Sequence, residues 1–391
     1  MEKKNVLLVH NFYQIGGGEH TVFENEKNML LENGHKVSVY TRSNDELKTS
    51  KWKMLMLPLA TVWSFKTYRD VRRLIKQQNI QVVHCHNTFP LISPSVYYAA
   101  RSLKIPVIQT IHNFRFLCPN GLFYCNGRIC EKCLETGSFL PAIKNSCYRN
   151  SKLQTAVVTA MLRIHRWLGT YRKINYIFLT EFTRSKFQKL IDIYSDAVFI
   201  KPNFVEKPEV CSGRKTQKPV FVFAGRLEEN KGIDFLLDVW PEMPKEYELH
   251  IYGDGSFRAQ CERAAAEQSN IHFGGFCPQS EVLADLADSV ALLFCSKLYE
   301  TFGMAWAESF SIGKPVVATN IGNHAALIED SKGGVLYDIE SKDAFIHALE
   351  EVIKNNKYYS CQAQTYYHKS LARENNYEKL REIYEQAVHI S

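Results

Sequence analysis

The chain has 391 residues, of which 45% are hydrophobic and 23% are charged, and its formal net charge is +7. This composition is typical of a globular protein of two domains, and no apolar run approaches the ~20 residues that a membrane-spanning helix needs. The mild positive charge suits phosphates or anionic lipid headgroups, whereas the absence of any nucleic-acid-binding module argues against nucleic acid as a partner.

Short apolar runs rich in β-branched residues predict the strands of the fold. They cover residues 6–9, 37–40, 82–84, 107–111 and 176–179 in the first half, and 220–224, 249–252, 271–273, 291–294 and 316–318 in the second. Uninterrupted runs that alternate with helical segments favour parallel sheets covered on both faces. We therefore predict an α/β fold of two doubly wound, Rossmann-like domains that face each other across a cleft. Ligands are expected at the carboxyl ends of the strands, and residues 206–219, without apolar periodicity, are interpreted as the linker.

The N-terminus, MEKKNVLLVH, predicts a buried strand and not a signal peptide, so a cytoplasmic location is expected. The strand leads into HNFYQIGGGEH, and a helix is predicted to begin near Glu19. Consecutive glycines such as Gly17 let the backbone approach a ligand closely, and the following helix N-terminus favours an anion. The segment lacks the G-x-G-x-x-G spacing, which disfavours a dinucleotide site. A loop without a ligand is the alternative.

Cysteines gather after His112, at the end of the strand 107–111. They are Cys118, Cys125, Cys130, Cys133 and, in SCYRN, Cys147. In a reducing compartment, close thiols favour zinc over disulfides, and Cys130-x2-Cys133 has the spacing of half a zinc site. The other spacings are irregular, so free thiols in a loop are the alternative.

Two stretches, Trp63–Arg73 and Lys144–Lys173, interleave basic residues with aromatic and aliphatic ones. An amphipathic helix of this composition can lie on an anionic membrane surface. Alternatively, its apolar face belongs to the domain core and its charges are simply solvated.

In the second half, the strand 220–224 runs into GRLEENKG, which places Arg226 and Lys231 in the loop before a helix at 233–240. The guanidinium of arginine is a rigid fork suited to phosphate oxygens, and lysine adds a compact charge. A diphosphate gains most from such residues where a strand ends and a helix begins. Ordinary surface charge is the alternative.

The stretch YETFGMAWAE contains Glu300, in the loop after the strand 291–294, and Glu308, inside the helix that should begin near residues 301–303. Each residue of a helix turns by ~100°, so side chains eight positions apart differ in direction by about 80°. The two glutamates are therefore not expected to form one carboxylate dyad, and we assign them different functions.

These motifs, in this order, resemble the family-4 retaining glycosyltransferases of the GT-B fold. The resemblance rests on GRLEENKG, on the E-x7-E spacing of Glu300 and Glu308, on the GGGEH loop, on HNF at 112–114 and on PNFVE at 202–206, and it covers nearly the whole chain. It implies an acceptor-side domain over residues 1–204 and a nucleotide-sugar donor-binding domain over residues 205–372. The C-terminal helix, residues 373–391, is then expected to pack back on the first domain.

The resemblance also implies site residues, and no cofactor required for catalysis. They are Arg226, Lys231 and Gly17 for the donor diphosphate, Glu308 for the ribose, Glu300 and His112 as catalytic residues, and the backbone of Phe302, Gly303 and Met304 for the sugar or phosphate. The chain departs from the family at Phe204 and Glu206, where Gly and Asp are usual, and at Asn113, where many relatives carry Asp.

By this resemblance the chain is an enzyme that transfers a sugar from a nucleotide diphosphate sugar, with retention, to a polyprenyl-diphosphate-linked glycan. It looks similar to transferases of surface polysaccharides of the capsule and O-antigen type. That similarity implies a structural zinc site of Cys118, Cys130, Cys133 and Cys147, and a peripheral location on the inner face of the plasma membrane. Two alternatives are a nucleotide-sugar 2-epimerase of the same architecture and a non-catalytic nucleotide-sugar-binding partner.

Overall fold

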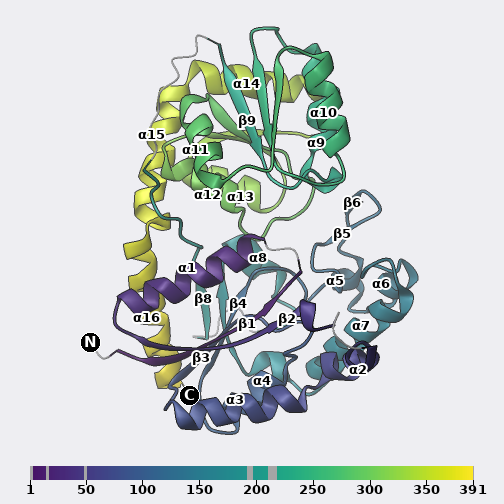
Figure 1. Ribbon diagram of the computed structural model, residues 1–391, viewed down its shortest axis with the longest axis vertical. Coiled ribbons are helices and arrows are strands. Elements are labelled where there is room, and N and C mark those ends of the chain that lie inside the picture. The colour runs from purple at the N-terminus through teal and green to yellow at the C-terminus, as the bar shows by residue number, and fades with distance from the viewer. Residues whose placement is uncertain (1–2, 15–16, 48–50, 192–196, 210–217, 391) are drawn as a thin grey trace. The chain divides into compact units, whose positions relative to one another are not determined.

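The computed structural model describes residues 3–14, 17–47, 51–191, 197–209 and 218–390 (Figure 1). The chain forms two compact units. The first comprises Met1–Cys125, Cys130–Asn203 and Asn376–Ser391, and the second comprises Asn126–Ile129 and Phe204–Asn375. Most of the predicted linker, residues 210–217, lies outside the described residues, as does Gly16 of the glycine-rich loop.

Among the described residues, the first unit is built on a six-stranded parallel sheet of order β2-β1-β3-β4-β7-β8. Its strands are β1 (Asn5–Phe12), β2 (Lys36–Ser43), β3 (Val82–Asn87), β4 (Val107–Ile111), β7 (Asn175–Phe178) and β8 (Val198–Ile200). The interior of β1 and all of β3 are buried, as expected for central strands that helices cover on both faces.

The helices of the first unit connect these strands, except α16, which follows the second unit in sequence. They are α1 (Gly18–Glu32), α2 (Lys51–Val62), α3 (Phe65–Gln77), α4 (Ser95–Arg101), α5 (Lys132–Thr136), α6 (Leu140–Lys144), α7 (Lys152–Trp167), α8 (Glu181–Lys186) and most of α16 (Arg373–Ile390), with the 3-10 turns η1 (Asn44–Leu47) and η2 (Thr170–Arg172). The short strands β5 (Tyr124–Cys125) and β6 (Arg128–Ile129) lie outside the large sheet.

The second unit has a parallel sheet of order β11-β10-β9-β12-β13-β14 in the part of the chain that the structure describes. Its strands are β9 (Val220–Ala224), β10 (Glu248–Tyr252), β11 (Ile271–Gly275), β12 (Ala291–Phe294), β13 (Val316–Thr319) and β14 (Gly334–Tyr337). Its helices and turns are η3 (Glu229–Lys231), α9 (Ile233–Val239), η4 (Trp240–Glu242), α10 (Arg258–Glu267), α11 (Gln279–Asp288), α12 (Met304–Ser311), α13 (Asn323–Ser331), α14 (Lys342–Lys354), α15 (Asn356–Tyr366) and the π turn η5 (Tyr367–Leu371).

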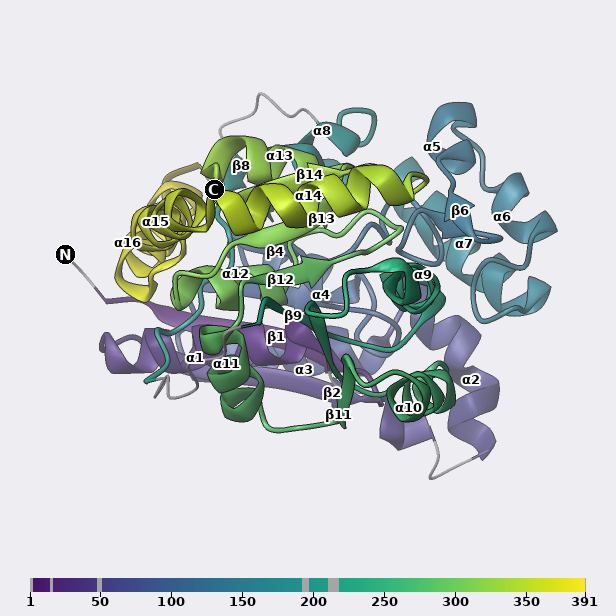
Figure 2. The same ribbon diagram turned by 90° about the horizontal axis from the view of Figure 1, so that it is seen from above.

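Helix α14 illustrates how the sequence specifies these elements. The hydroxyl of Ser341 caps its first turn by accepting a hydrogen bond from the N–H of Ala344 at 3.1 Å. Phe345, Leu349 and Val352 recur at helical spacing, and each is buried in the core of the second unit. Seen from above (Figure 2), α14 lies over β13 and β14 while α10 lies beside β11. Each fully buried aliphatic or aromatic side chain of this kind stabilises the unit by roughly 1.5–3 kcal/mol.

Helix α16 is fastened to the first unit by polar contacts between buried side chains. The hydroxyl of Tyr384 lies 2.8 Å from His84 Nδ1 on β3, and Lys201 donates a hydrogen bond to Asn376 at 2.9 Å. These contacts join the last residues of the chain to the sheet of the first unit.

None of the helices formed by the described residues is long and apolar enough to cross a membrane.

Candidate active site

The charged loops of the second unit meet where its strand order reverses. Strands β9 and β12 are hydrogen-bonded neighbours at the centre of the sheet, although β10 and β11 lie between them in sequence. The loop after β9 carries Arg226 and Lys231, and the loop after β12 carries Glu300. At such a switch point the two loops diverge and leave a ligand-binding crevice at the carboxyl ends of the strands.

Lys231 and Glu300 form an ion pair across this switch point. The ammonium of Lys231 donates a hydrogen bond to Glu300 Oε1, and the hydroxyl of Ser296 donates to the same oxygen at 2.8 Å. Burial opposes ionisation of Glu300, but the charge and hydrogen bond of Lys231, with His324 and Ser296, outweigh it and lower the pKa of Glu300 below its usual value. Glu300 is therefore an anion at neutral pH, suited to accepting hydrogen bonds from hydroxyl groups.

Arg226 projects from the same loop and is exposed. No carboxylate lies within ion-pair distance of it in the described parts of the chain. Further along the loop, Gly232 has φ +76°, and a Cβ there would lie 2.0 Å from the carbonyl oxygen of Cys295. Only glycine lets the loop pass this close to the end of β12, and this close passage places Lys231 beside Glu300.

Phe302, Gly303 and Met304 form the N-terminal end of α12. Gly303 has φ +97°, and a Cβ would lie 2.7 Å from the rings of both Phe294 and Trp306. The carbonyl of Phe302 accepts hydrogen bonds from Trp306 Nε1 at 2.6 Å and from Asn323 Nδ2 at 3.4 Å, which fixes the turn into the helix. The amide groups at this helix end favour an anion or an oxygen acceptor.

Glu308 lies in the second turn of α12 and differs from Glu300 in its surroundings. Its Oε1 accepts a hydrogen bond from Gln279 Nε2 at 2.6 Å. Burial raises the pKa of Glu308 to about 7, and the hydrogen bond from Gln279 only partly opposes this rise. The two glutamates thus have separate partners and pKa values shifted in opposite directions, which is typical of carboxyl groups with different roles.

His324, at the start of α13, is a candidate that the sequence reasoning missed. Thr319 donates its hydroxyl proton to the carbonyl of Ser296 at 2.8 Å, so it accepts the Nδ1–H of His324, also at 2.8 Å. Burial lowers the pKa of His324 to about 4, although the charge of Glu300 opposes the shift. His324 Nε2 is therefore a neutral acceptor, buried and without a hydrogen-bond partner among the described residues. The available signal was the polar pair Asn323-His324 in the segment that follows the predicted strand 316–318, after residues 319–322.

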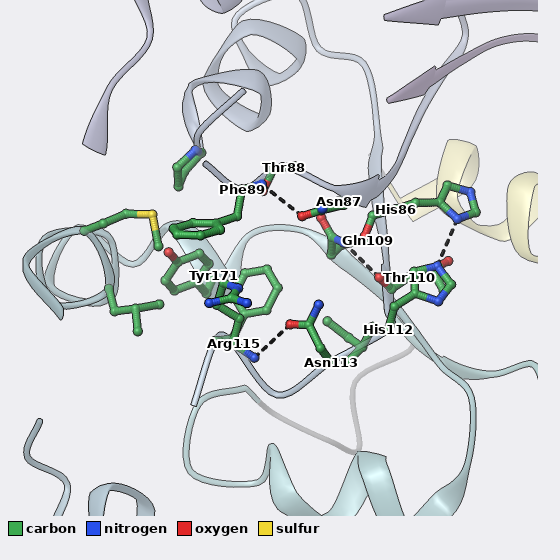
Figure 3. A pocket seen from close by; sticks show the side chains of 15 residues that line it. His86, Asn87, Thr88, Phe89, Gln109, Thr110, His112, Asn113, Arg115 and Tyr171 are labelled. Carbon is green, nitrogen blue, oxygen red and sulfur yellow. Dashed lines mark hydrogen bonds between the residues drawn. The ribbon is translucent and has the colours of Figure 1, made fainter. Parts of the chain in front are cut away.

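In the first unit, His112 lines a small pocket of about 30 Å³ at the carboxyl ends of β3 and β4 (Figure 3). Its Nε2 lies 3.0 Å from His86 Nδ1, and the two rings stack with centroids 5.2 Å apart. Burial, followed by the charges of His86 and His10, holds the pKa of His112 well below its usual value, so the ring is neutral at physiological pH. Asn113 accepts a hydrogen bond from the N–H of Arg115 at 3.0 Å, a contact that shapes the pocket wall.

A buried ion pair stands behind His86 and was not foreseen from sequence. Glu26 of α1 places Oε1 3.0 Å from His84 Nδ1 and 3.3 Å from His86 Nε2, while its Oε2 lies 3.1 Å from Lys201 Nζ. Burial opposes the charge of Glu26, but Lys201 and the two histidines hold its pKa well below the usual value. The carboxylate therefore lies on the Nε2 side of His86, whose Nδ1 is 3.0 Å from His112 Nε2.

Gly17 precedes α1 and is exposed, and a Cβ at this position would meet no atom within 4 Å. Space around residue 17 therefore does not itself require glycine. Its predicted contact with a phosphate stays a prediction.

The five cysteines of the predicted cluster lie in and around α5. Cys118 and Cys133 are buried, Cys130 and Cys147 are half-buried, and Cys147 Sγ lies 3.8 Å from the Sγ of Cys125, the residue predicted to be spare. Burial raises the pKa of Cys133 to about 11 and that of Cys147 to about 12, and neighbouring thiols add to both shifts. No three sulfur atoms lie within 4.8 Å of one another among the described residues. Zinc binding by the predicted set stays a prediction.

Two doubly wound parallel sheets, with acidic and basic loops meeting at the switch point of the second, define the class of GT-B glycosyltransferases. A family model described as "Glycosyltransferase Family 4" matches residues 15–206, and one described as "Glycosyl transferases group 1" matches residues 207–369. The chain belongs to the family-4 glycosyltransferases. The predicted family and fold are thereby confirmed.

Relatives and a solved structure agree with this assignment. The chain is 24% identical over 371 residues to a subunit of the phosphatidylinositol N-acetylglucosaminyltransferase of Arabidopsis thaliana, covering 90% of this chain and 74% of that protein. It is 28% identical over 141 residues to the lipopolysaccharide core biosynthesis glycosyltransferase LpsE of Rhizobium meliloti, covering 35% and 40%. The structure of Anabaena HepE in complex with UDP-glucose matches with a TM-score of 0.64 at 14% identity, over 97% of this chain and 98% of that one.

Proposed function

We propose that this protein transfers a sugar from a nucleotide diphosphate sugar to a lipid-linked glycan in surface-polysaccharide biosynthesis, with retention of the anomeric configuration. The observation that carries the proposal is the Lys231–Glu300 ion pair at the switch point, with the exposed Arg226 in the same loop as Lys231. A nucleotide diphosphate sugar has an anionic diphosphate and a hydroxyl-bearing ring, and these residues complement both.

The proposed step breaks the bond between the anomeric carbon and the diphosphate oxygen, whose electron pair leaves with the diphosphate. Arg226 and Lys231 stabilise the charge that develops on the departing oxygens. The acceptor hydroxyl forms the new bond on the same face, and its proton passes to the leaving phosphate. Because one oxygen of Glu300 already accepts from Lys231 and Ser296, the carboxylate is suited to orienting sugar hydroxyls and not to covalent attack.

His324 and Glu308 complete the proposed donor site. The unpartnered Nε2 of His324 is a buried acceptor within electrostatic reach of Glu300, so a hydroxyl of the donor sugar would satisfy it. Glu308, further along α12, is assigned to the ribose hydroxyls. His112, in the first unit, is assigned to the acceptor side of the reaction. HepE is known in complex with UDP-glucose and LpsE is a lipopolysaccharide transferase, which supports a nucleotide-sugar donor and a surface glycan as product.

Turnover of a donor panel tests the proposal. UDP, GDP, ADP and dTDP sugars are each incubated with the protein, with and without a membrane lipid extract. We expect nucleoside diphosphate release from one donor class that depends on the extract, and a product whose anomeric proton coupling in NMR matches that of the donor. An epimer that accumulates without extract would instead establish the isomerase, and binding of a donor without turnover would establish a non-catalytic partner.

The first unit also has a surface suited to an anionic membrane. Helices α2 and α7 pack beside each other (Figure 1), and both expose apolar side chains. These are Met54, Leu55, Met56 and Leu59 on α2, and Leu153, Ile164 and Trp167 on α7, followed by Leu168. Helix α3 adds Lys66, Arg69 and Arg73, which share the single carboxylate of Asp70, so its exposed face is net positive. We propose that these three helices dock on anionic lipid.

Within α7, the apolar and basic residues divide between core and surface. Val158, Met161 and Leu162 are buried, so part of the predicted amphipathic face belongs to the domain core. Arg166 also turns inward, donating to the carbonyl of Phe116 at 2.6 Å and packing over the ring of Phe139. Arg163, Ile164 and Trp167, which are exposed, are therefore residues of α7 that a membrane would contact.

Replacing Arg163 with glutamate removes one positive charge and adds a negative one, so it should weaken binding to vesicles that contain anionic phosphatidylglycerol by about tenfold or more, because a basic residue near such a surface contributes roughly 1 kcal/mol and about 1.4 kcal/mol corresponds to tenfold. Replacing Trp167 with alanine should also weaken binding, because it removes a large apolar side chain from the docking face. Vesicle co-sedimentation at low salt measures the effect. Phe276→Ala is the matched control, since Trp167 is 85% exposed and Phe276, on the second unit, is 83% exposed. Binding that is unchanged in the α7 variants, or equally weakened by the control, contradicts docking through this face.

A further inference from the structure

Two histidines and a glutamate form a cluster in the second unit, toward the amino ends of its strands, whereas Arg226 and Glu300 follow the carboxyl ends. Glu248 and His250 lie on β10, and His272 lies on the neighbouring edge strand β11. His250 and His272 are register partners, and Glu248 precedes His250 by two positions, so all three side chains project from one face of the sheet. They are brought together by strand pairing, since β10 and β11 are separated by α10 in sequence.

The spacing of these side chains is close to that of a metal site. Glu248 Oε2 lies 3.8 Å from His250 Nε2 and 3.9 Å from His272 Nε2, and one ligand atom from each residue falls within 4.8 Å of the others. Ligands of a tetrahedral zinc ion, at about 2.0–2.1 Å from the metal, are separated by about 3.3 Å. Small side-chain rotations therefore suffice to bring the three residues around one ion.

A carboxylate behind His250 prepares its ring for a metal. Asp285 Oδ2, on α11, lies 2.6 Å from His250 Nδ1 and also accepts the hydroxyl of Tyr252 at 3.0 Å. This contact holds the proton on Nδ1 and leaves a lone pair on Nε2, the arrangement found where a histidine ligates a metal. His250 is 8% exposed, and its Nε2 has no hydrogen-bond partner among the described residues. A cation at this point would satisfy an acceptor that is otherwise orphaned.

The cluster is also accessible and has the charge that a cation needs. It lines a surface pocket of about 370 Å³ together with Asp285 and Asp288. The side chain of His272 is 51% exposed, so an ion has a path from solvent and room for a water ligand. Glu248 also pairs through Oε1 with Lys218 at 2.7 Å, but Lys218 is 56% exposed and leaves Oε2 toward the histidines. A second cluster, Glu26 with His84 and His86, differs because it is buried together with its cation, Lys201.

We propose that Glu248, His250 and His272 bind a divalent transition-metal ion, zinc above all, with water as the fourth ligand. Imidazole and carboxylate ligands suit zinc, and three protein ligands with an open position form an exchangeable site. The ion would link the edge strand β11 to β10 and, through Asp285, to α11. Its role is to stabilise the second unit, so the site is independent of the proposed sugar transfer.

Cobalt titration of the full-length, chelator-treated protein tests the site. We expect visible d–d absorption of tetrahedral Co²⁺ from one equivalent that has no matching near-ultraviolet thiolate charge-transfer band, whereas Co²⁺ on the predicted cysteine set would add a separate equivalent that has one. His272→Ala, at a half-exposed position, should abolish this absorption, and Asp285→Asn should weaken Co²⁺ binding about 10–100-fold. His347→Ala, whose side chain is 79% exposed on α14, is the matched control and should bind as the wild type does.

Thermal unfolding supplies a second measurement. Zn²⁺ should raise the unfolding temperature of the wild type and of His347→Ala but not that of His272→Ala, because a ligand stabilises only the folded state that binds it. A Co²⁺ spectrum with thiolate bands alone places the metal on the cysteines and overturns the proposal. So does a spectrum or a temperature shift that is identical in His272→Ala.

Discussion

Glu300→Gln is expected to reduce kcat/KM by about 10²–10³-fold, the loss that follows removal of one preorganised electrostatic group from an active site. The amide is nearly the size of the carboxylate but carries no charge. It cannot pair with the ammonium of Lys231, nor hold the sugar hydroxyls as an anion does. Both losses destabilise the transition state, in which the sugar becomes positively charged and the diphosphate gains negative charge. Steady-state release of nucleoside diphosphate from the preferred donor measures the change.

Two further measurements separate this loss from a structural one. The affinity for the nucleoside diphosphate itself, measured by calorimetry, should change little, because Glu300 is assigned to the sugar and not to the nucleotide. Glu281→Gln, an exposed glutamate at the start of α11, is the matched control and should keep full activity. An E300Q variant that keeps more than a tenth of the activity contradicts the assignment. A covalent sugar adduct on Glu300, trapped in the wild type, contradicts the proposed positioning role.

The pH dependence of the wild type tests the same group. Despite burial, Lys231 and the other partners of Glu300 hold its pKa below the ordinary value of 4.5. Its anionic form therefore persists down to that lower pKa, and loss of activity by protonation of Glu300 should occur only below pH 4.5. Glu308, with its pKa raised to about 7, titrates near neutrality instead. Protonation of Glu308 should therefore lower kcat as the pH decreases from about 8 to 6, and Glu308→Gln should remove this pH dependence.

The sequence predicts the sheets because their central strands are nearly continuous apolar runs. All ten predicted strands occur, and β4, β9 and β12 have the predicted bounds. The sequence missed the short pair β5 and β6 and, in the two large sheets, one edge strand each. β8 is a half-buried strand of three residues, and β14 begins at glycine, so neither has the long apolar signal of a strand buried on both faces. Helix α12 begins at Met304, after the predicted start near residues 301–303, because Gly303 turns into it with a positive φ.

The candidate site is predictable only where a residue type and its place in a loop suffice. Arg226, Lys231 and Glu300 follow strands, and the switch-point rule places those loops together. The ion pair between Lys231 and Glu300, 69 positions apart, depends on the close passage of Gly232 past β12, which a pattern of residues does not encode. His324 is a lone histidine in sequence. Its role as an acceptor is evident only in the structure, where the hydroxyl of Thr319 fixes the tautomer of the His324 ring.

The interior of the first unit supplies the prediction with the largest effect on stability. Glu26 and Lys201 are each 1% exposed and lie 175 positions apart. Lys201→Met should lower the free energy of unfolding by about 3–5 kcal/mol, because it leaves a buried carboxylate without its cation. Hydrogen exchange of β1 and β3 in a urea series, followed by mass spectrometry, assigns the loss to the first unit. Lys342→Met, which breaks surface pairs with Asp238 and Glu242, is the matched control and should change stability little.

A double variant and the stability of the protein at acidic pH show why Lys201→Met lowers the free energy of unfolding. Replacing Glu26 as well, by leucine, removes the orphaned charge, so Glu26→Leu with Lys201→Met should be more stable than Lys201→Met alone.

In the wild type the native pKa of Glu26 lies well below the ordinary value of 4.5. The contribution of Glu26 to stability is therefore complete above pH 4.5 and is lost as the pH falls toward the native pKa. Lys201→Met should already show the loss at neutral pH and decline less on further acidification. A double variant less stable than Lys201→Met would show that the pair stabilises the unit by its contacts and not by balancing charge. Because Glu26 also contacts His86, the neighbour of His112, the same variants report whether this buried carboxylate sets the position of the pocket histidine.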